Sequence, residues 1–419
     1  MQNRVLRQLS TFERFFWLHN QIEPVHFAVA ALAEGATTVN AWRAGLSSLQ
    51  HRHPFLMASI GADANAAPCF ISRPGVPIPL RVVPGNVLQR LDTEVARELS
   101  TAFRDGDALL VRAVLLHEEQ RSIVMLVAHH SIADALSLVY AIRDLLQLLS
   151  GEKLAPLPVP PSHEALLGLE EDVIGESGGG AFETDAPLNR KFQELVPRVT
   201  SLRMTRELTS NLQKISRQEK TSMQGALASS VVFAMRELVK RESPAPVRLA
   251  SPISTRKQLN QSDDCVVLTD TGILDLDIPA SGDFWELARR VKSELSPQTS
   301  LPSIAERRRA FQQVLANVFD AEGTLELARR GMNVDFVLTN LGNLSVERQY
   351  GRLRLEALWP AILIGTSENR HVLGVATVGG RLSLMYCSYT PIPHLLETME
   401  SLLTEACTKQ MLAHPVGAV

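Results

Sequence analysis

The sequence SIVMLVAHHSIADA, residues 122–135, decides how the first half of the chain folds. Its first seven residues are almost wholly apolar, which is typical of a central strand buried on both faces. Apolar residues then recur at helical spacing and predict a helix near 136–149, through Leu136, Val139, Tyr140, Ile142, Leu145, Leu146 and Leu149. The polar segment His129–Asp134 therefore lies between the end of a buried strand and the start of a helix.

His130 and Asp134 are the candidate catalytic pair in this segment, four positions apart. An imidazole titrates near neutrality, so His130 can take a proton from a hydroxyl or an amine that attacks a carbonyl. The carboxylate one turn away can steer the ring, or it can lock the loop by pairing with a distant arginine. The segment thus predicts general-base catalysis within a ternary complex.

Two other kinds of site have less support from the residues. A metal site would need a third ligand, and the sequence has no HExxH or similar motif. Covalent catalysis is not indicated either, because there is no GxSxG motif and no cysteine close to a histidine in sequence.

Composition narrows the class of protein. A chain of 419 residues is long enough for two domains, and its 45% hydrophobic and 21% charged residues are typical of a globular protein. A net charge of -3 does not suggest a nucleic-acid partner. Four well-separated cysteines indicate neither a disulfide framework nor a zinc site. We find no secretory signal and no apolar run that would span a bilayer, so we expect a cytoplasmic protein without a transmembrane segment.

The flanking sequence predicts a mixed α/β (α+β) protein. In the first half we expect a helix from Thr37 or Thr38 to about Leu49, another near 89–103, and a strand over 108–117 that pairs with 122–128. Prolines and glycines over 151–190 are typical of a linker. In the second half we expect helices near 206–218, 222–241, 283–295 and 303–317, strands near 247–253 and 266–277, and a hairpin that turns at Gly379-Gly380. The predicted domains are an N-terminal lobe (1–160), a linker (161–190) and a C-terminal lobe (191–419).

The segment HHSIADA, residues 129–135, resembles the HHxxxDG motif of the condensation-domain superfamily. That superfamily includes peptide-synthetase condensation domains, plant-type acyltransferases, chloramphenicol acetyltransferases and the polyketide-associated acyltransferases that make phthiocerol diesters. Further segments resemble the family's motifs in the same order along nearly the whole chain: Leu9-Ser10 with Glu13 and Phe16-Trp17, then 49–56, 107–113, 251–256 and 337–342.

The resemblance implies two chloramphenicol-acetyltransferase-like lobes in a V, with a central tunnel and His130 at its middle. It implies that His130 is the general base and that Asp134 is structural, paired with Arg256. A buried pair of that kind mainly fixes geometry. Residues expected to contact substrate are His129, Ser131, Thr339, Asn340 and Gly342, and donors such as Thr339 and Asn340 would help to stabilise an oxyanion.

The resemblance also implies partners. We expect no permanently bound cofactor and no metal. The co-substrate would be acyl-CoA or a phosphopantetheine thioester, and the acceptor a small-molecule alcohol or amine. An acyl carrier protein, being acidic, would dock on arginines, for which Arg307–Arg309 and Arg329–Arg330 are candidates. We expect a monomer.

The chain departs from the family motifs at two places. Ala135 replaces the motif glycine, which adds a methyl group close to the histidine, and the DFGWG segment has no match, with Asn340-Leu341-Gly342 in its place. The second departure favours the ester-forming, polyketide-associated branch. The leading hypothesis is therefore an O-acyltransferase of natural-product or lipid biosynthesis. A stand-alone amide-forming condensation enzyme and a catalytically silent scaffold stay open, although a silent copy would have no reason to keep both His130 and Asp134.

Overall fold

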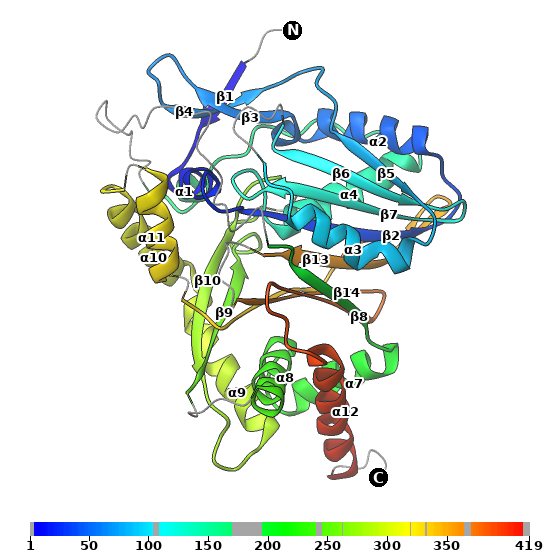
Figure 1. Cartoon of the computed structure of the whole chain (residues 1–419), viewed down its shortest axis with the longest axis vertical. Helices are drawn as coiled ribbons and strands as arrows, with labels where there is room; N and C mark the ends of the chain where they lie inside the picture. Colours follow the sequence, from blue (N-terminus) through cyan, green and yellow to red (C-terminus); the bar gives the residue numbers. More distant parts are fainter. Residues whose placement is uncertain are drawn as a thin grey trace.

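Two six-stranded sheets, each with its own helices, are stacked along the long axis of the molecule (Figure 1). The computed structural model describes residues 4–103, 109–169, 195–239, 245–261, 263–318, 320–331, 333–363 and 370–413. The prediction of a mixed α/β protein with two lobes is confirmed. The V shape and the central tunnel stay predictions.

The first sheet has the strand order β12-β13-β2-β7-β6-β5. Neighbouring strands are antiparallel except β5 and β6, which are parallel. The strands, in that order, are Gln349–Tyr350, Leu353–Ile362, His26–Glu34, Arg121–His129, Val111–His117 and Leu80–Pro84.

The central strand β7 is buried on both faces, as its apolar run predicts. Val124 and Leu126 join a core cluster with helices α2 (Val39–Arg52) and α4 (Ala135–Leu149). Ile123 and Met125, which point to the opposite face, join a second cluster with α3 (Val87–Leu99). Because side chains of a strand alternate between faces, a run without polar residues fits only a strand that is covered on both sides.

The second sheet has the order β10-β9-β11-β14-β15-β8. The strands are, in that order, Thr269–Leu276, Val247–Ser254, Phe336–Asn343, His371–Val378, Arg381–Ser388 and Arg198–Arg203. Its outer face carries four helices, seen below it in Figure 1: α7 (Arg206–Gln218), α8 (Met223–Leu238), α9 (Phe284–Leu295) and α12 (Leu395–Ala413). The predicted hairpin joins β14 to β15, and both turn glycines have positive φ (56° and 72°), as a type I′ turn requires.

The remaining elements lie at the side and the top of this stack (Figure 1). Helix α1 (Thr11–Asn20) packs against α10 (Leu301–Leu315) and α11 (Ala321–Gly331). A small third sheet has the order β1-β4-β3 (Arg4–Gln8, Pro68–Ser72 and Ala58–Ala62). Two short 3-10 helices are η1 (Pro54–Met57) and η2 (Ser296–Thr299).

The predicted sequence boundary between the lobes does not follow the strand pairing. Strands β12 and β13 fall within the range 191–419, yet β13 pairs with β2 of the first sheet. The two sheets then meet where β13 passes β14, and a Cβ atom added at Gly374 would lie only 1.9 Å from the Pro360 carbonyl oxygen. A glycine is therefore needed where β14 passes Pro360 of β13.

The predicted linker also begins with ordered structure. Helix α5 (His163–Leu166) is capped by the Ser162 side chain, and His163 and Glu164 are buried. Residues 170–190 of the linker lie outside the described residues. None of the helices in the described part of the chain is long and apolar enough to cross a membrane.

Candidate active site

His130 is the first residue after β7, and backbone contacts fix its position. Its amide donates to the Val25 carbonyl at 3.1 Å, directly beyond the pairing of β7 with β2. The imidazole lies 4.6 Å from the Phe16 ring at an interplanar angle of 8°, and 4.7 Å from the Phe27 ring at 41°. The residue is 5% exposed, so it is buried without being fully enclosed.

Burial decides the protonation of this imidazole. Desolvation lowers the pKa of His130 to about 4, although the Asp134 carboxylate and nearby backbone groups act in the opposite direction. The ring is therefore unprotonated near pH 7. An unprotonated imidazole can accept a proton, which is what a general base requires.

Asp134 is the N-cap of α4, and every contact of its carboxylate is with a donor. Oδ1 accepts from the Ser137 amide at 2.8 Å and from Arg256 Nη2 at 2.9 Å. Oδ2 accepts from the Leu268 amide at 3.0 Å. Burial alone would raise the pKa of Asp134, but Arg256 and these hydrogen bonds outweigh it and hold the pKa below its ordinary value. The side chain is a buried carboxylate with a full set of partners.

Arg256 reaches Asp134 from the second lobe, as the resemblance implies, with Nη2 2.9 Å from Oδ1. It lies on the segment 255–268 between β9 and β10, which crosses to the first lobe. The Nη2 atom also donates to Ser137 Oγ at 2.7 Å and to the Val266 carbonyl at 2.8 Å. The start of α4 and the crossing segment are thus held together at the residue pair next to His130.

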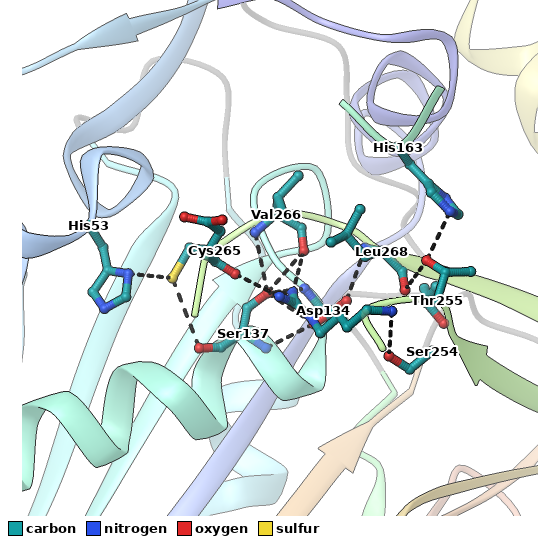
Figure 2. A network of polar contacts seen from close by, with 12 residues as sticks. His53, Asp134, Ser137, His163, Ser254, Thr255, Cys265, Val266 and Leu268 are labelled. Carbon is teal, nitrogen blue, oxygen red and sulfur yellow. Dashed lines mark hydrogen bonds and ion pairs between the residues drawn. The ribbon is translucent and has the colours of Figure 1, made fainter. Parts of the chain in front are cut away.

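The same crossing segment makes a second contact that the sequence did not indicate. Cys265 Sγ lies 3.6 Å from His53 Nδ1, and His53 Nε2 lies 3.0 Å from Asp144 Oδ2 (Figure 2 shows the first of these contacts). Burial acts to lower the pKa of His53, but Cys265 and Asp144 outweigh it and raise the pKa to about 9. The buried His53 ring is therefore positively charged near neutral pH, and it forms part of the contact between the two lobes.

His163 of α5 adds a third contact to this segment. Its Nε2 and Thr255 Oγ1 are 3.0 Å apart, and its Nδ1 accepts from Arg308 Nη2 at 3.1 Å. Burial, Arg308 and Arg256 lower the pKa of His163 to about 2, so the ring is neutral. Thr255 Oγ1 donates to the Leu268 carbonyl, which leaves His163 Nε2 as the donor to Thr255.

The predicted first-lobe contacts His129 and Ser131 flank His130 in the chain, and their side chains meet each other. His129 is the last residue of β7, so its side chain and that of His130 leave the chain in different directions. His129 Nδ1 is 2.8 Å from Ser131 Oγ, and both side chains are buried. Burial, with nearby His26 and His130, lowers the pKa of His129 to about 3. These two residues are engaged with each other.

The predicted second-lobe contacts Thr339, Asn340 and Gly342 all lie in β11. Thr339 is buried in the strand, and Asn340 Oδ1 accepts from the Gly342 amide at 2.9 Å. Gly342, with φ of 76°, borders a cavity of about 280 Å³ at the start of α8. That cavity does not include His130, and its lining is Gln213, Ser216, Arg217, Thr221, Ser222, Met223, Gly342, Asn343 and Thr377.

Four of the five arginines predicted as a carrier-protein surface are engaged with other side chains. Arg307 pairs with Asp270 at 2.5 Å. Arg308 is only 3% exposed and lies over the Phe12 ring, so the prediction that it docks a partner is wrong. Its long apolar stem and its contact with His163 explain the burial. The two on α11 pair with glutamates, Arg329 with Glu23 and Arg330 with Glu326.

Two residues near His130 were not predicted as site residues from the sequence. Ser137 completes a reciprocal capping box with Asp134, and the spacing of these two residues could have indicated it. Phe16 stacks on the imidazole from α1, more than a hundred residues earlier in the chain, and no local pattern could have indicated that contact. Ala135, in place of the motif glycine, is the first residue of α4 and packs on the core of the first lobe.

Metal ligation and thiol chemistry have no evident centre in the part of the chain that the structure describes. Within it, no group of three or more His, Cys, Asp or Glu side chains is placed to hold a metal ion. All four cysteines are buried as free thiols.

Comparisons with known proteins agree with this architecture. Residues 193–387 match the family model of the phthiocerol/phthiodiolone dimycocerosyl transferase C-terminus. The structure resembles polyketide synthase associated protein 5 from Mycobacterium tuberculosis, with 18% identity, a TM-score of 0.69, and coverage of 98% of this chain and 100% of that one. No curated protein matches the chain in sequence.

Two further solved structures have the same fold. One is the first condensation domain of the calcium-dependent antibiotic synthetase, with 15% identity, a TM-score of 0.64 and coverage of 98% of both chains. The other is a wax ester synthase/diacylglycerol acyltransferase from Marinobacter aquaeolei, with 12% identity, a TM-score of 0.61, and coverage of 96% of this chain and 99% of that one. The resemblance to the condensation-domain superfamily is confirmed.

Proposed function

We propose, from the premise that this chain has the condensation-domain fold and a C-terminal half that matches the phthiocerol/phthiodiolone dimycocerosyl transferase family, that it is an acyltransferase. It moves an acyl group from a thioester donor, acyl-CoA or an acyl carrier protein, to a hydroxyl acceptor in lipid or natural-product biosynthesis. His130 is the general base. The family match and the wax ester synthase likeness support acyl transfer, and the former supports an ester product.

The reaction needs one proton acceptor and no covalent enzyme intermediate. His130 takes the proton of the acceptor hydroxyl while that oxygen attacks the thioester carbonyl carbon. The tetrahedral oxyanion then collapses, the C–S bond breaks, and the leaving thiolate takes the proton back from the imidazolium. Because Nδ1 of the ring is buried, we assign the proton transfer to Nε2.

One observation carries this proposal: His130 is an unprotonated, nearly buried imidazole beside a locked lobe junction. Its pKa of about 4 leaves the free base at neutral pH. The Asp134 carboxylate is not available to orient the ring, because both of its oxygens accept hydrogen bonds from Ser137, Leu268 and Arg256. Asp134 and Arg256 therefore have a structural role in the proposal, which is to hold the start of α4 against the second lobe.

The donor would carry phosphate groups, and the cavity beside Gly342 suits an anion. It lies at the N-terminus of α8, where the first backbone amides point outward and the helix dipole favours negative charge. Arg217 is among the residues that line the same cavity. We propose that Gly342 and this cavity take part in donor binding, with Thr339 and Asn340 closer to the acyl group. Contact of substrate with His129 and Ser131 stays part of the proposal.

The test is a thiol-release assay with a panel of acyl-CoAs and alcohol or amine acceptors, with products identified by mass spectrometry. His130→Ala should lower turnover by roughly two to four orders of magnitude, the usual contribution of a general base. His117→Ala is the matched control, because His117 lies at the end of β6 in the same sheet and its Nδ1 is 2.9 Å from Ser122 Oγ of the neighbouring strand. Equal turnover of His130→Ala and the wild type would refute the mechanism, and transfer to amines alone would refute ester formation.

A further inference from the structure

Aromatic packing surrounds the His130 ring. Its Nδ1 is buried and has no partner with full hydrogen-bond geometry within the described ranges, although backbone groups of His130 and Ala133 lie near enough to act on its pKa. The Asp134 carboxylate, which could have oriented the ring, is taken up by its contacts with α4 and the crossing segment. Catalytic imidazoles need a fixed ring plane, so the rings packed against His130 matter for its function.

Phe16 supplies that constraint by its geometry. The two rings are nearly parallel, with an interplanar angle of 8° and centroids 4.6 Å apart. Rotation of the imidazole about its Cβ–Cγ bond would break this parallel contact and turn the ring edge toward the phenyl face. Phe27 contacts the imidazole at 41°, so it limits the ring without defining its plane.

Phe16 is itself held in place from the far side. Helix α1, which carries it, begins with a complete capping box between Ser10 and Glu13. The Phe12 ring meets Phe16 edge-on at 4.6 Å and 60°, and Phe311 of α10 meets Phe12 at 5.7 Å and 81°. Phe16 also belongs to a small core cluster between α1, α10 and α11, and is 6% exposed. The stacking partner is thus rigid.

From this arrangement we infer that Phe16 is a positioning residue, which holds the imidazole plane of His130 in the orientation that accepts the acceptor's proton. The inference rests on the proposed function. The aromatic face of Phe16 also lies against the imidazolium that forms during transfer, and such a face attracts a cation. Phe16 acts through the position of the His130 ring.

The chain offers a matched pair of variants, Phe16→Leu and Phe15→Leu. Both phenylalanines are buried on α1 and both belong to the same cluster. Phe15 contacts the rings of Phe12, Phe16, His19 and Phe311, but has no ring contact with His130 in the described structure. Leucine keeps the apolar volume and removes the flat face. Phe16→Met, with a more adaptable side chain, replaces Phe16→Leu if that variant does not fold.

Two measurements decide the inference, steady-state kinetics and ¹⁵N NMR of the His130 ring. Phe16→Leu should lower kcat by roughly 10- to 100-fold, as misplacement of a catalytic group does, and leave KM within about threefold. Phe15→Leu should leave kcat within about threefold. The ring nitrogens of His130 should give one set of signals in the wild type and in Phe15→Leu, and exchange-broadened or multiple signals in Phe16→Leu.

A folded Phe16→Leu protein with unchanged kcat and one set of ring signals would overturn the inference, and so would equal losses of kcat in both variants. The NMR result does not depend on turnover. Full activity of His130→Ala would refute the proposed function, while the ring signals would still show whether Phe16 orients His130.

Discussion

Replacing Asp134 by asparagine changes one buried oxygen into an amino group and removes one negative charge. Every partner of the Asp134 carboxylate is a donor: the amide and hydroxyl of Ser137, the Leu268 amide and the Arg256 guanidinium. Asparagine has a single acceptor oxygen, so its NH2 group must face at least one of these hydrogen-bond donors. The N-cap itself is kept, because asparagine caps helices as well as aspartate does.

The cost follows from burial. The side chains of Arg256 and Asp134 are 3% and 7% exposed, so Asp134→Asn leaves a guanidinium buried beside a neutral group. Breaking a buried ion pair from one side costs about 3–5 kcal/mol. We expect Asp134→Asn to lower the free energy of unfolding by about that much at pH 7, measured by urea denaturation.

Asp283→Asn is the matched control. Asp283 also caps a helix, α9, where one oxygen accepts from the Trp285 and Glu286 amides, but its side chain is 47% exposed. An asparagine oxygen can replace that acceptor without a buried donor clash. We expect a change within about 0.5 kcal/mol, as for most exposed substitutions.

The pH dependence gives a second check. The pKa of Asp134 is lowered in the folded protein, from about 4 in an unfolded chain. The stabilisation is therefore fully present above pH 4 and is lost as the pH falls through the folded pKa. The difference between wild type and Asp134→Asn should be constant from pH 5 to 8 and narrow below pH 4. A difference below about 1 kcal/mol at pH 7, or one that persists unchanged in acid, would refute the reasoning.

Two further substitutions test the junction between the lobes. Gly374→Ala puts a Cβ atom 1.9 Å from the Pro360 carbonyl oxygen and should lower the free energy of unfolding by about 3 kcal/mol or more. Gly380→Ala is the control: with φ of 72° and open space around it, it should lower the free energy of unfolding by only about 1 to 2 kcal/mol. Similar melting temperatures for the two variants would contradict the close approach of the sheets. His53→Gln should destabilise the protein mainly below about pH 6.5. The pKa of His53 is raised to about 9 in the folded state, so the charged ring stabilises the fold fully below the unfolded pKa of about 6.5, and this stabilisation is lost as the pH rises to 9. A wild-type-to-variant difference that grows from pH 6.5 to 9 would contradict the pairing of His53 with Asp144.

Much of the fold was predictable because it is encoded locally. The apolar run before His129 predicts a strand covered on both faces, and the helical spacing after Asp134 predicts α4; both are present. The Gly379-Gly380 pair predicts its hairpin, since only residues that tolerate positive φ form that turn. The Asp134–Arg256 contact was implied by the family resemblance and is present at 2.9 Å, while the catalytic roles of the site residues stay predictions.

Contacts between distant segments have no such local code. The sequence by itself determined the elements, the strand-to-helix corner that presents His130, and the resemblance that points to acyl transfer. Only the tertiary structure decided that β13 joins the first sheet, that Cys265 meets His53, and that Phe16 stacks on His130. Periodicity and capping reflect interactions between residues that are close in sequence. Contacts between residues more than a hundred positions apart depend on how the sheets and helices pack against one another, and no single stretch of sequence determines that packing.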